Sequence, residues 1–265
     1  MRLLHFTDPH LYADASATLK AVNTSNTFRA VVDMARVSHP EAAFCLLTGD
    51  LAQDEKAGAY VRLAEVIRTL GAPAYALNGN HEDPDEMRRG FQKVPGAVRR
   101  DGSFFAGNWQ VILLNSRQAG QVAGRLSDAE LIRLDRALCA HAHHHALICL
   151  HHQPVPVGSA WIDDIGLLNG DALLNVLARH GNVRAVLWGH VHQAFDETRR
   201  VGEGGVRLLS TPSTCFQFVP GVTEFALDTA APGYRWLDLL PDGDIDTGIE
   251  YLQNAPVAKD DGNIY

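Results

Sequence analysis

The segment LLHFTDPH, residues 3–10, is the stretch from which the fold can be inferred. Its first half, Leu3 to Phe6, is a short apolar run typical of a buried strand, and Asp8-Pro9-His10 follows at once. Open α/β sheets place their ligand sites at the carboxyl ends of their strands. A carboxylate and an imidazole at this position therefore predict a sheet whose strand ends carry the functional side chains.

Four further apolar runs end in the same way. They cover residues 42–47, 73–77, 146–150 and 183–188, and they are followed by Gly49-Asp50, Gly79-Asn80-His81, His151-His152 and Gly189-His190-Val191-His192. Residues i and i+2 of an extended backbone point to the same side, so we expect Asp8 with His10, and His190 with His192, each to converge on one centre. The glycines are expected to permit sharp turns and close backbone approach to the site.

The residue types in these five motifs indicate a metal site. Carboxylate, amide and imidazole groups form a mixed oxygen and nitrogen donor set, which suits zinc, manganese or iron better than calcium. No cysteine belongs to the motifs, which argues against a structural zinc site. Each motif alone is common by chance, but five of them in order behind buried strands predict a metal centre.

The rest of the chain alternates between helical and strand patterns. Helical spacing covers residues 26–37, 56–70 and 171–179, and Ser127-Asp128-Ala129-Glu130 is a capping box that opens a helix to about Cys139. Residues 104–109 predict a hairpin that leads into a strand at 111–114, and strand patterns dominate after Thr198. We expect one α/β domain, residues 1–255, with helices covering two central sheets and a polar tail at 256–265. The order of the strands stays open.

Composition excludes several classes of function. The 265 residues include 23 Lys and Arg against 31 Asp and Glu, a net charge of −8, which argues against broad nucleic-acid binding. No apolar run reaches the length of a membrane-spanning helix, and an acidic residue at position 8 comes too early for a signal peptide. The four cysteines form no CxxC pair and are expected to be reduced thiols. We expect a cytoplasmic protein with a small-molecule partner, and the sequence leaves a homo-oligomer open.

With these motifs assembled, the chain resembles the calcineurin-like metallophosphoesterases, whose pattern is Asp-x-His, Gly-Asp, Gly-Asn-His, His and Gly-His-x-His. It is similar in more detail to the bacterial class III 3′,5′-cyclic-AMP phosphodiesterases. That further similarity lies in residues 22–24, 48–54, 188–193, 211–215, 225–229 and 231–233. The resemblance implies a four-layer αββα sandwich of two mixed sheets flanked by helices, with a two-metal centre.

The resemblance also implies a role for each motif residue. Asp8, His10 and His192 would hold one metal; Asn80, His151 and His190 would hold the other; and Asp50 would bridge the two. His81 would contact the phosphate and protonate the leaving oxygen, so that His81, Asp50 and Asn80 count as catalytic. The substrate would lie against His10, Asp50, Asn80, His81 and His192. Glu82 and Asn115 stand where these enzymes usually have Asp, outside the ligand set.

The expected reaction is hydrolysis of a 3′,5′-cyclic nucleotide, cyclic AMP first, to the 5′-nucleotide by a hydroxide that bridges the metals. The alternatives are hydrolysis of glycerophosphodiesters or other small phosphodiesters at the same centre, and an inactive metal-binding regulatory protein.

Several residues have more than one interpretation. His152 is a substrate-side or supporting residue, or a packed imidazole. The cluster of His141 and His143–His145 suits a helix exit, with an accessory metal site as the alternative. Residues 155–169 are a candidate lid or interface. Trp161, Phe216 and Phe218 line a base-binding slot or simply pack, and His5, His39 and His180 are expected at the surface or beside strands.

Overall fold

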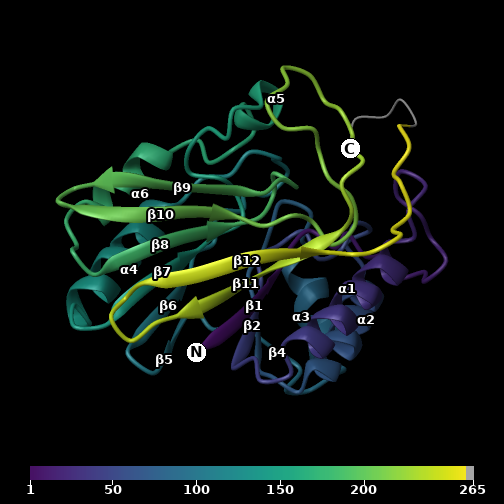
Figure 1. The fold of residues 1–265 in the computed structure, drawn as a ribbon, viewed down its shortest axis with the longest axis horizontal. Helices are drawn as coiled ribbons and strands as arrows, with labels where there is room; N and C mark the ends of the chain where they lie inside the picture. The colour runs from purple at the N-terminus through teal and green to yellow at the C-terminus, as the bar shows by residue number, and fades with distance from the viewer. Residues whose placement is uncertain (261–265) are drawn as a thin grey trace.

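Two six-stranded sheets form the centre of the protein in a computed structural model, which describes residues 1–260 (Figure 1). The first sheet has the order β12-β11-β1-β2-β3-β4, and the second has the order β5-β6-β7-β8-β10-β9. The strands of the first sheet are β1 (Arg2–Phe6), β2 (Phe44–Leu47), β3 (Ala74–Ala76), β4 (Val98–Arg99), β11 (Gly233–Leu239) and β12 (Ile245–Tyr251). Those of the second are β5 (Ser103–Ala106), β6 (Trp109–Leu113), β7 (His145–Cys149), β8 (Val183–Trp188), β9 (Phe195–Val201) and β10 (Gly204–Ser210).

Both sheets are mixed, and each has a parallel centre. Strands β1 to β4 run parallel in the first sheet, and β6, β7, β8 and β10 run parallel in the second. Antiparallel strands complete the edges, namely β11 and β12 in one sheet and β5 and β9 in the other. The carboxyl ends of the parallel strands therefore gather at one edge of each sheet.

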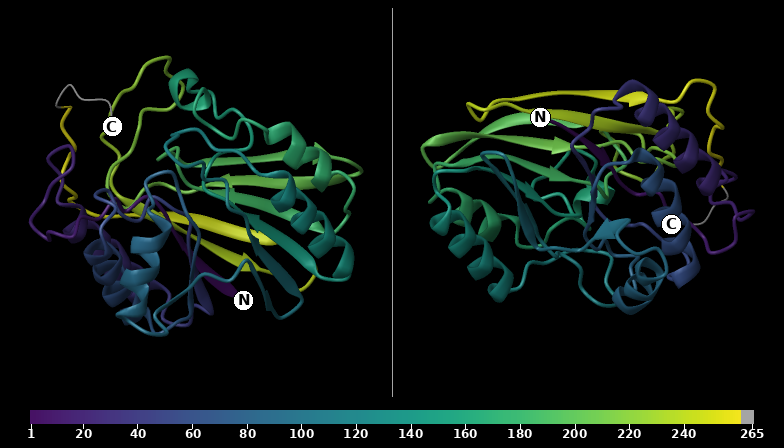
Figure 2. Two further views of the ribbon diagram at one scale, coloured as in Figure 1. Left: turned by 180° about the vertical axis from the view of Figure 1, so that it is seen from behind. Right: turned by 90° about the horizontal axis from the view of Figure 1, so that it is seen from below.

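Helices cover the outer face of each sheet, and the two groups lie on opposite sides of the molecule (Figure 2). The first group is α1 (Thr24–Ser38), α2 (Ala57–Ile67) with the 3₁₀ turn η1 (Arg68–Leu70), and α3 (Pro84–Gln92). The second is α4 (Asp128–Ala140), the short α5 (Ala160–Asp163) and α6 (Gly170–Leu177). Side chains of Asn23, Asp83 and Ser127 cap α1, α3 and α4 by accepting backbone N–H bonds, as N-cap residues do.

Alternation along the central strands explains the layers. In β1, Leu4 and Phe6 pack on the helices of the first group, whereas Leu3 belongs to a separate apolar cluster between the sheets with Leu147 of β7 and Leu187 of β8. A third cluster lies between the second sheet and its helices. Helix, sheet, sheet and helix thus form the four-layer αββα sandwich that the resemblance implies.

The five strands predicted ahead of the motifs are confirmed as β1, β2, β3, β7 and β8, and the Gly107-Asn108 turn joins β5 to β6. Helix α3 was not predicted. In the tail, residues 252–260 form no helix or strand, and the Lys259 N–H donates to the Lys20 carbonyl at 2.9 Å. Residues 261–265 of the predicted tail lie outside the described residues, and the division at 255 stays a prediction.

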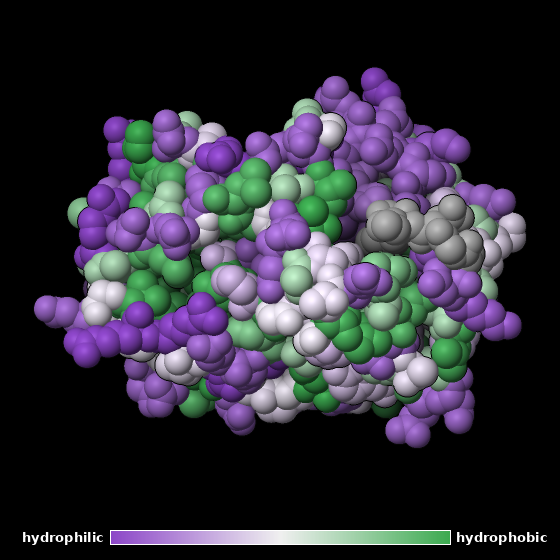
Figure 3. Space-filling view, turned by 90° about the horizontal axis from the view of Figure 1, so that it is seen from above, coloured by the Kyte–Doolittle hydropathy of each residue, from purple (hydrophilic) through white to green (hydrophobic). Residues whose placement is uncertain are grey.

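No helix in the described part of the chain is long and apolar enough to cross a membrane. All four cysteines are free; Cys45, Cys149 and Cys215 are buried, and Cys139 is exposed. On the face that carries α5, small apolar patches alternate with hydrophilic residues (Figure 3).

Candidate metal centre

The five predicted motifs follow the carboxyl ends of parallel strands in both sheets, and they meet there. One donor atom each from Asp8, His10 and His192 lie within 4.8 Å of one another. The same holds for Asp8, Asp50 and His151, and for His151, His152 and His190. Six of the seven predicted ligands therefore fall into overlapping groups of donor atoms, and Asn80 joins them because its Oδ1 lies 3.1 Å from His151 Nε2.

Asp50 lies between the two halves of this centre. Its Oδ2 is 3.3 Å from Nε2 of His151 and 3.9 Å from Nε2 of His10. On the first half, Nε2 of His192 lies 3.3 Å from Nε2 of His10 and 3.6 Å from Asp8 Oδ1. A carboxylate shared by two imidazole groups is the arrangement that a bridging ligand requires.

Three of the imidazoles are held so that Nε2 faces the centre. The Nδ1 atom of His10 lies 2.8 Å from Gln53 Oε1, that of His151 lies 2.7 Å from the Thr48 carbonyl, and that of His192 lies 2.8 Å from the Phe216 carbonyl. An oxygen acceptor on one ring nitrogen fixes the tautomer and leaves the other nitrogen as a metal ligand. These side chains therefore fit a pair of metal ions.

His190 provides a further indication of the fit. Its side chain is buried, and Nε2 has no hydrogen-bond partner among residues 1–260. Buried polar atoms are normally paired, so an unpartnered imidazole nitrogen on a ring 5.0 Å from that of His151 is unusual. It suits a site whose remaining partners are ions rather than side chains.

His152 lies in one of the donor groups, but its ring nitrogens contact other protein atoms. Its Nδ1 is 2.8 Å from Ser116 Oγ, and its Nε2 is 2.8 Å from the Val122 carbonyl. Both ring nitrogens are therefore occupied by protein atoms, and the ring is fully buried. His152 ties the loop after β6 to the metal centre, which is the supporting role among the interpretations of this residue.

Backbone geometry corrects the reasoning about residues i and i+2. Asp8, His10, Asp50, His190 and His192 have φ values of 51°, 45°, 49°, 66° and 46°, which is the left-handed region and not an extended strand. Such a conformation costs roughly 1–2 kcal/mol for a non-glycine residue. Asp8 and His10 do converge, whereas His190 and His192 fall into different donor groups, contrary to the expectation of one shared centre.

The buried carboxylates of Asp8 and Asp50 stay ionised. Burial alone would raise the pKa of Asp50, but the nearby imidazoles of His151 and His81 hold it well below its usual value. The same balance, with His192 as the main opposing group, lowers the pKa of Asp8 to about 2. Burial lowers the pKa of His10 and of His190 to about 3, so these two imidazoles are neutral, whereas at His151 burial is outweighed by the Asp50 carboxylate, which raises the pKa to about 9.

Glu82 supports the centre by binding backbone N–H groups beside it; the sequence marked this position only as a departure from the family's usual Asp. Its carboxylate accepts N–H bonds from Asp50 at 2.9 Å, Leu51 at 2.7 Å and Ala52 at 3.3 Å, and a further one from Gly79. Burial, together with the charge of Asp50, raises its pKa to about 7. The residue that departs from the family pattern thus ties the loop after β2 to the loop after β3.

Two glycines are required by close approach, as the sequence predicts. A Cβ atom on Gly79 would collide with Asp50 Oδ1, and one on Gly189 would collide with Thr7 Oγ1 and lie 2.6 Å from Asp8 Oδ2. Both positions press backbone directly against a predicted ligand, so a methyl group there would displace a carboxylate.

We expect Gly189→Ala to weaken metal binding about 10- to 100-fold, the range for groups that support metal ligands, because the new methyl group displaces Asp8. Titration of the metal-free protein with Mn²⁺ measures the effect. Gly181→Ala is the matched control, since nothing lies within 4 Å of a Cβ at that position. Equal Mn²⁺ affinity in both variants would contradict the argument.

Asn80 and His81 are partly exposed, whereas the other six predicted site residues are buried. The ring of His81 lies 5.1 Å from that of His10, and its backbone N–H donates to Asp50 Oδ1 at 3.0 Å. One donor atom of His81 also lies within 4.8 Å of donors of His10 and Asp50. His81 therefore borders the centre on a side that a substrate can reach.

The aromatic residues near the site pack against each other. The ring of Phe218 stacks on His192 at 4.3 Å and meets Trp161 edge-on at 5.0 Å, and Phe216 belongs to the same apolar cluster. This contact supports the packing interpretation of Trp161, Phe216 and Phe218, with Phe218 bracing a predicted ligand.

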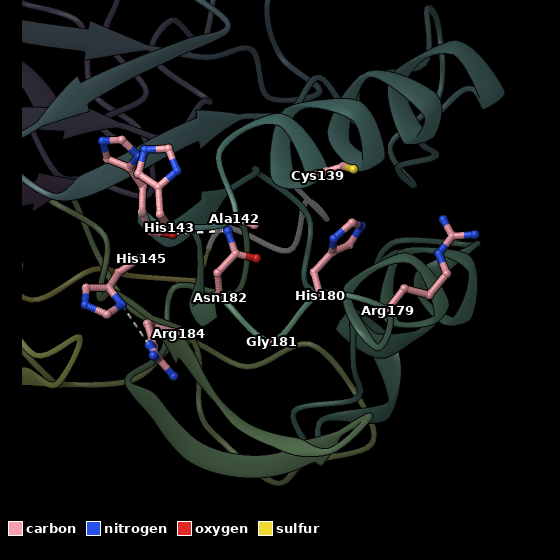
Figure 4. A pocket seen from close by; sticks show the side chains of 10 residues that line it. Cys139, Ala142, His143, His145, Arg179, His180, Gly181, Asn182 and Arg184 are labelled. Carbon is pink, nitrogen blue, oxygen red and sulfur yellow. Dashed lines mark hydrogen bonds between the residues drawn. The ribbon is translucent and has the colours of Figure 1, made fainter.

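His143, His144 and His145 of the histidine cluster after α4 line a separate pocket of about 400 Å³ (Figure 4). His143 and His145 lie on one side of this pocket, and His180 and Arg179 lie on the other. Within residues 1–260, no three His, Cys, Asp or Glu side chains of this cluster bring donor atoms within 4.8 Å of one another. The accessory metal site is therefore unsupported, and the helix-exit interpretation fits, since α4 ends at Ala140.

The remaining histidines were expected at the surface or beside strands, and none of the three is fully exposed. His5 is fully buried between the sheets, and His39 is 7% exposed between Arg2 and Glu250. His180 is half-buried against Asp135.

The fold and the site together define a metal-dependent phosphoesterase. The chain belongs to the calcineurin-like phosphoesterase family, whose sequence profile matches residues 1–194. It is 40% identical over 253 residues to the 3′,5′-cyclic adenosine monophosphate phosphodiesterase CpdA of Pseudomonas aeruginosa, covering 96% of this chain and 90% of that protein. It is 38% identical to CpdA of Escherichia coli K12, covering 98% and 93% of the two chains. The family inferred from the motifs is confirmed.

Solved structures agree on the fold. A dimetal phosphatase from Danio rerio superposes with a TM-score of 0.61 at 16% identity, covering 89% of this chain and 94% of that one. Purple acid phosphatase from yellow lupin gives a TM-score of 0.61 at 12% identity, over 97% of this chain and 52% of that one. At these identities the likeness concerns the fold alone.

Proposed function

We propose that this protein hydrolyses 3′,5′-cyclic nucleotides, cyclic AMP foremost, to 5′-nucleotides. The observation that carries the proposal is the convergence of seven donor residues around Asp50, whose Oδ2 lies 3.3 Å from His151 Nε2 and 3.9 Å from His10 Nε2, with His81 on the accessible side. The curated relatives named as cyclic AMP phosphodiesterases match nearly the whole chain, including the part beyond residue 194. That coverage supports the cyclic-nucleotide substrate over other phosphodiesters.

The centre would hold two metal ions. Asp8, His10 and His192 would bind one, Asn80, His151 and His190 the other, and Asp50 both. The mixed donor set is suited to iron, manganese or zinc. Such ions neutralise phosphate charge and supply a nucleophile at neutral pH.

The chain's own residues would orient the substrate and move one proton. His10, Asp50, Asn80, His81 and His192 would border the phosphate, and the amide of Asn80 and the ring of His81 reach the accessible side. The imidazole of His81 would give its proton to the departing 3′-oxygen. Ionised Asp8 and Asp50 would hold the cations that attract the anionic substrate in a chain of net charge −8.

A small diffusible substrate fits the chain better than nucleic acid or a membrane surface. The net charge is negative, and a nucleic-acid binder needs a basic face. The free cysteines favour a reducing compartment, so we place the protein in the cytoplasm.

We expect chelation to remove two metal ions per chain and to abolish hydrolysis of cyclic AMP, because the nucleophile and the charge neutralisation disappear together. Metal analysis before and after chelation, with turnover assayed on cyclic AMP, cyclic GMP and a glycerophosphodiester, measures both. Mn²⁺ added back should restore activity.

Three outcomes would contradict the proposal in different ways. Full turnover by chelated protein without metal would remove the dimetal mechanism. Turnover of glycerophosphodiesters without turnover of cyclic nucleotides would move the protein to the alternative substrate class. Two bound metals with no turnover of any of the three substrates would favour a regulatory protein.

A further inference from the structure

His5 lies in β1, the strand that leads into Asp8 of the candidate metal centre, although it belongs to none of the motifs. The side chain is fully buried, and both ring nitrogens contact threonine hydroxyls. Nδ1 lies 2.5 Å from Thr211 Oγ1, and Nε2 lies 2.6 Å from Thr48 Oγ1. Burial, followed by the charge of Arg235, lowers the pKa of His5 to about 3, so the ring is neutral with one donor and one acceptor.

A chain of short hydrogen bonds connects His5 to Asp8. Thr48 Oγ1 donates to Thr7 Oγ1 at 2.8 Å, and Thr7 Oγ1 donates to Asp8 Oδ2 at 2.6 Å. An ionised carboxylate accepts and cannot donate, so the hydroxyl of Thr7 must point at Asp8. The hydroxyl of Thr48 then points at Thr7, because each hydroxyl has a single proton.

The tautomer of His5 follows from this direction. Because the Thr48 hydroxyl donates its only proton to Thr7, Thr48 Oγ1 must accept a hydrogen bond from the N–H at Nε2 of His5. Nδ1 of His5 then carries the lone pair and accepts from the Thr211 hydroxyl. Donation thus runs one way from Thr211 through His5, Thr48 and Thr7 to Asp8, and every group in this relay is fully buried.

The segment Thr211–Cys215 also holds the backbone at the site. Ser213 Oγ donates to the Asp8 carbonyl at 2.8 Å, and the Thr214 N–H donates to the Thr7 carbonyl at 3.2 Å. The sequence singles out this segment as a motif, yet none of its residues belongs to the predicted ligand set.

We propose that His5 is a positioning residue that acts through Thr48 and Thr7 to fix the Asp8 carboxylate for metal binding. The hydroxyl of Thr7 donates to Oδ2 of Asp8. The other carboxylate oxygen, Oδ1, lies 3.6 Å from Nε2 of His192 and 4.0 Å from Nε2 of His10. The His190 N–H also lies 3.1 Å from Oδ1 and 3.0 Å from Oδ2 of Asp8, so the relay and this N–H together determine which oxygen of Asp8 is presented to the first metal. This inference rests on the proposed metal centre.

The test compares Mn²⁺ affinity, measured by calorimetry, of metal-free wild-type protein and three variants. His5→Leu removes the donor to Thr48 and should weaken one of the two Mn²⁺ sites about 10- to 100-fold, the range for groups that orient metal ligands, with the other site unchanged. His5→Gln keeps one donor and one acceptor and should restore most of the affinity. His39→Leu removes a buried imidazole that is hydrogen-bonded on both nitrogens outside the relay, and it should bind as wild type.

Thr7→Val carries the test if His5→Leu does not fold, because valine has the shape of threonine without the hydroxyl that Asp8 needs. Either folded variant with wild-type affinity at both sites overturns the relay. Failure of the metal centre itself looks different: wild type would bind no Mn²⁺, or Asp8→Ala would bind it as tightly as wild type. A loss of thermal stability without a change in Mn²⁺ affinity would mark His5 as a packing residue and overturn the proposal.

Discussion

Asp50→Ala is expected to lose both metal ions and to reduce kcat/KM for cyclic AMP by at least about 10³-fold. The carboxylate lies 3.3 Å from His151 and 3.9 Å from His10, so both halves of the centre lose a ligand at once. Metal ions stabilise a phosphoryl transition state by several kcal/mol, and about 1.4 kcal/mol corresponds to a tenfold rate change. Metal content and steady-state kinetics of the purified variant measure the two effects.

Two further variants separate bridging from ordinary charge effects. Asp33→Ala removes an exposed carboxylate of α1 and should change neither quantity. Asp8→Ala removes a ligand from one half and should retain more metal than Asp50→Ala. If Asp50→Ala and Asp8→Ala retained equal metal, Asp50 would hold a single ion and would not bridge.

Short-range patterns in the sequence were enough to predict many of the strands and helices. Each strand ahead of a motif is a compact apolar run because both of its faces are buried, as for Leu3 and Leu4 of β1. Their positions could therefore be predicted, but their neighbours could not. Strand β1 pairs with β11, where Leu3 lies opposite Leu237, and no local pattern links residues so far apart in the chain.

Helix α3 is an element that apolar spacing in the sequence does not predict. Its sequence PDEMRRGFQ is mostly polar, and it buries Met87, Gly90 and Phe91. Gly90, a poor helix former, is there because a Cβ would lie 2.6 Å from both Ala57 O and Tyr60 Cβ of α2. The N-cap Asp83 followed by Pro84 was the signal that could have revealed the helix.

The site divides in the same way between local and long-range information. The motifs predict which residues converge. They do not predict the left-handed backbone conformation of five of them, because φ at a non-glycine residue is imposed by surrounding hydrogen bonds. At Asp8, for example, the N–H donates to the Gly49 carbonyl at 3.1 Å. His5 was missed for a similar reason, since Thr48 and Thr211, which define its role, come from distant strand ends.

His81→Ala is expected to keep both metal ions and to lower kcat for cyclic AMP by about 10² to 10⁴, the range for loss of a general acid. The side chain is partly exposed beside His10, and it is not one of the seven predicted ligands. Metal analysis should therefore match wild type. His143→Ala, which removes an exposed imidazole that lines the separate pocket after α4, is the control for a lost histidine.

The leaving group provides the sharper test of His81. The alkoxide released from cyclic AMP is a strong base and needs a proton as it departs, whereas a nitrophenolate leaves readily without one. If His81 supplies that proton, the variant should lose much less activity on bis(4-nitrophenyl) phosphate than on cyclic AMP. Equal losses on the two substrates, with metal content unchanged, would show that His81 holds the phosphate instead. A loss of metal would place the ring among the ligands, as its distance to His10 and Asp50 also allows.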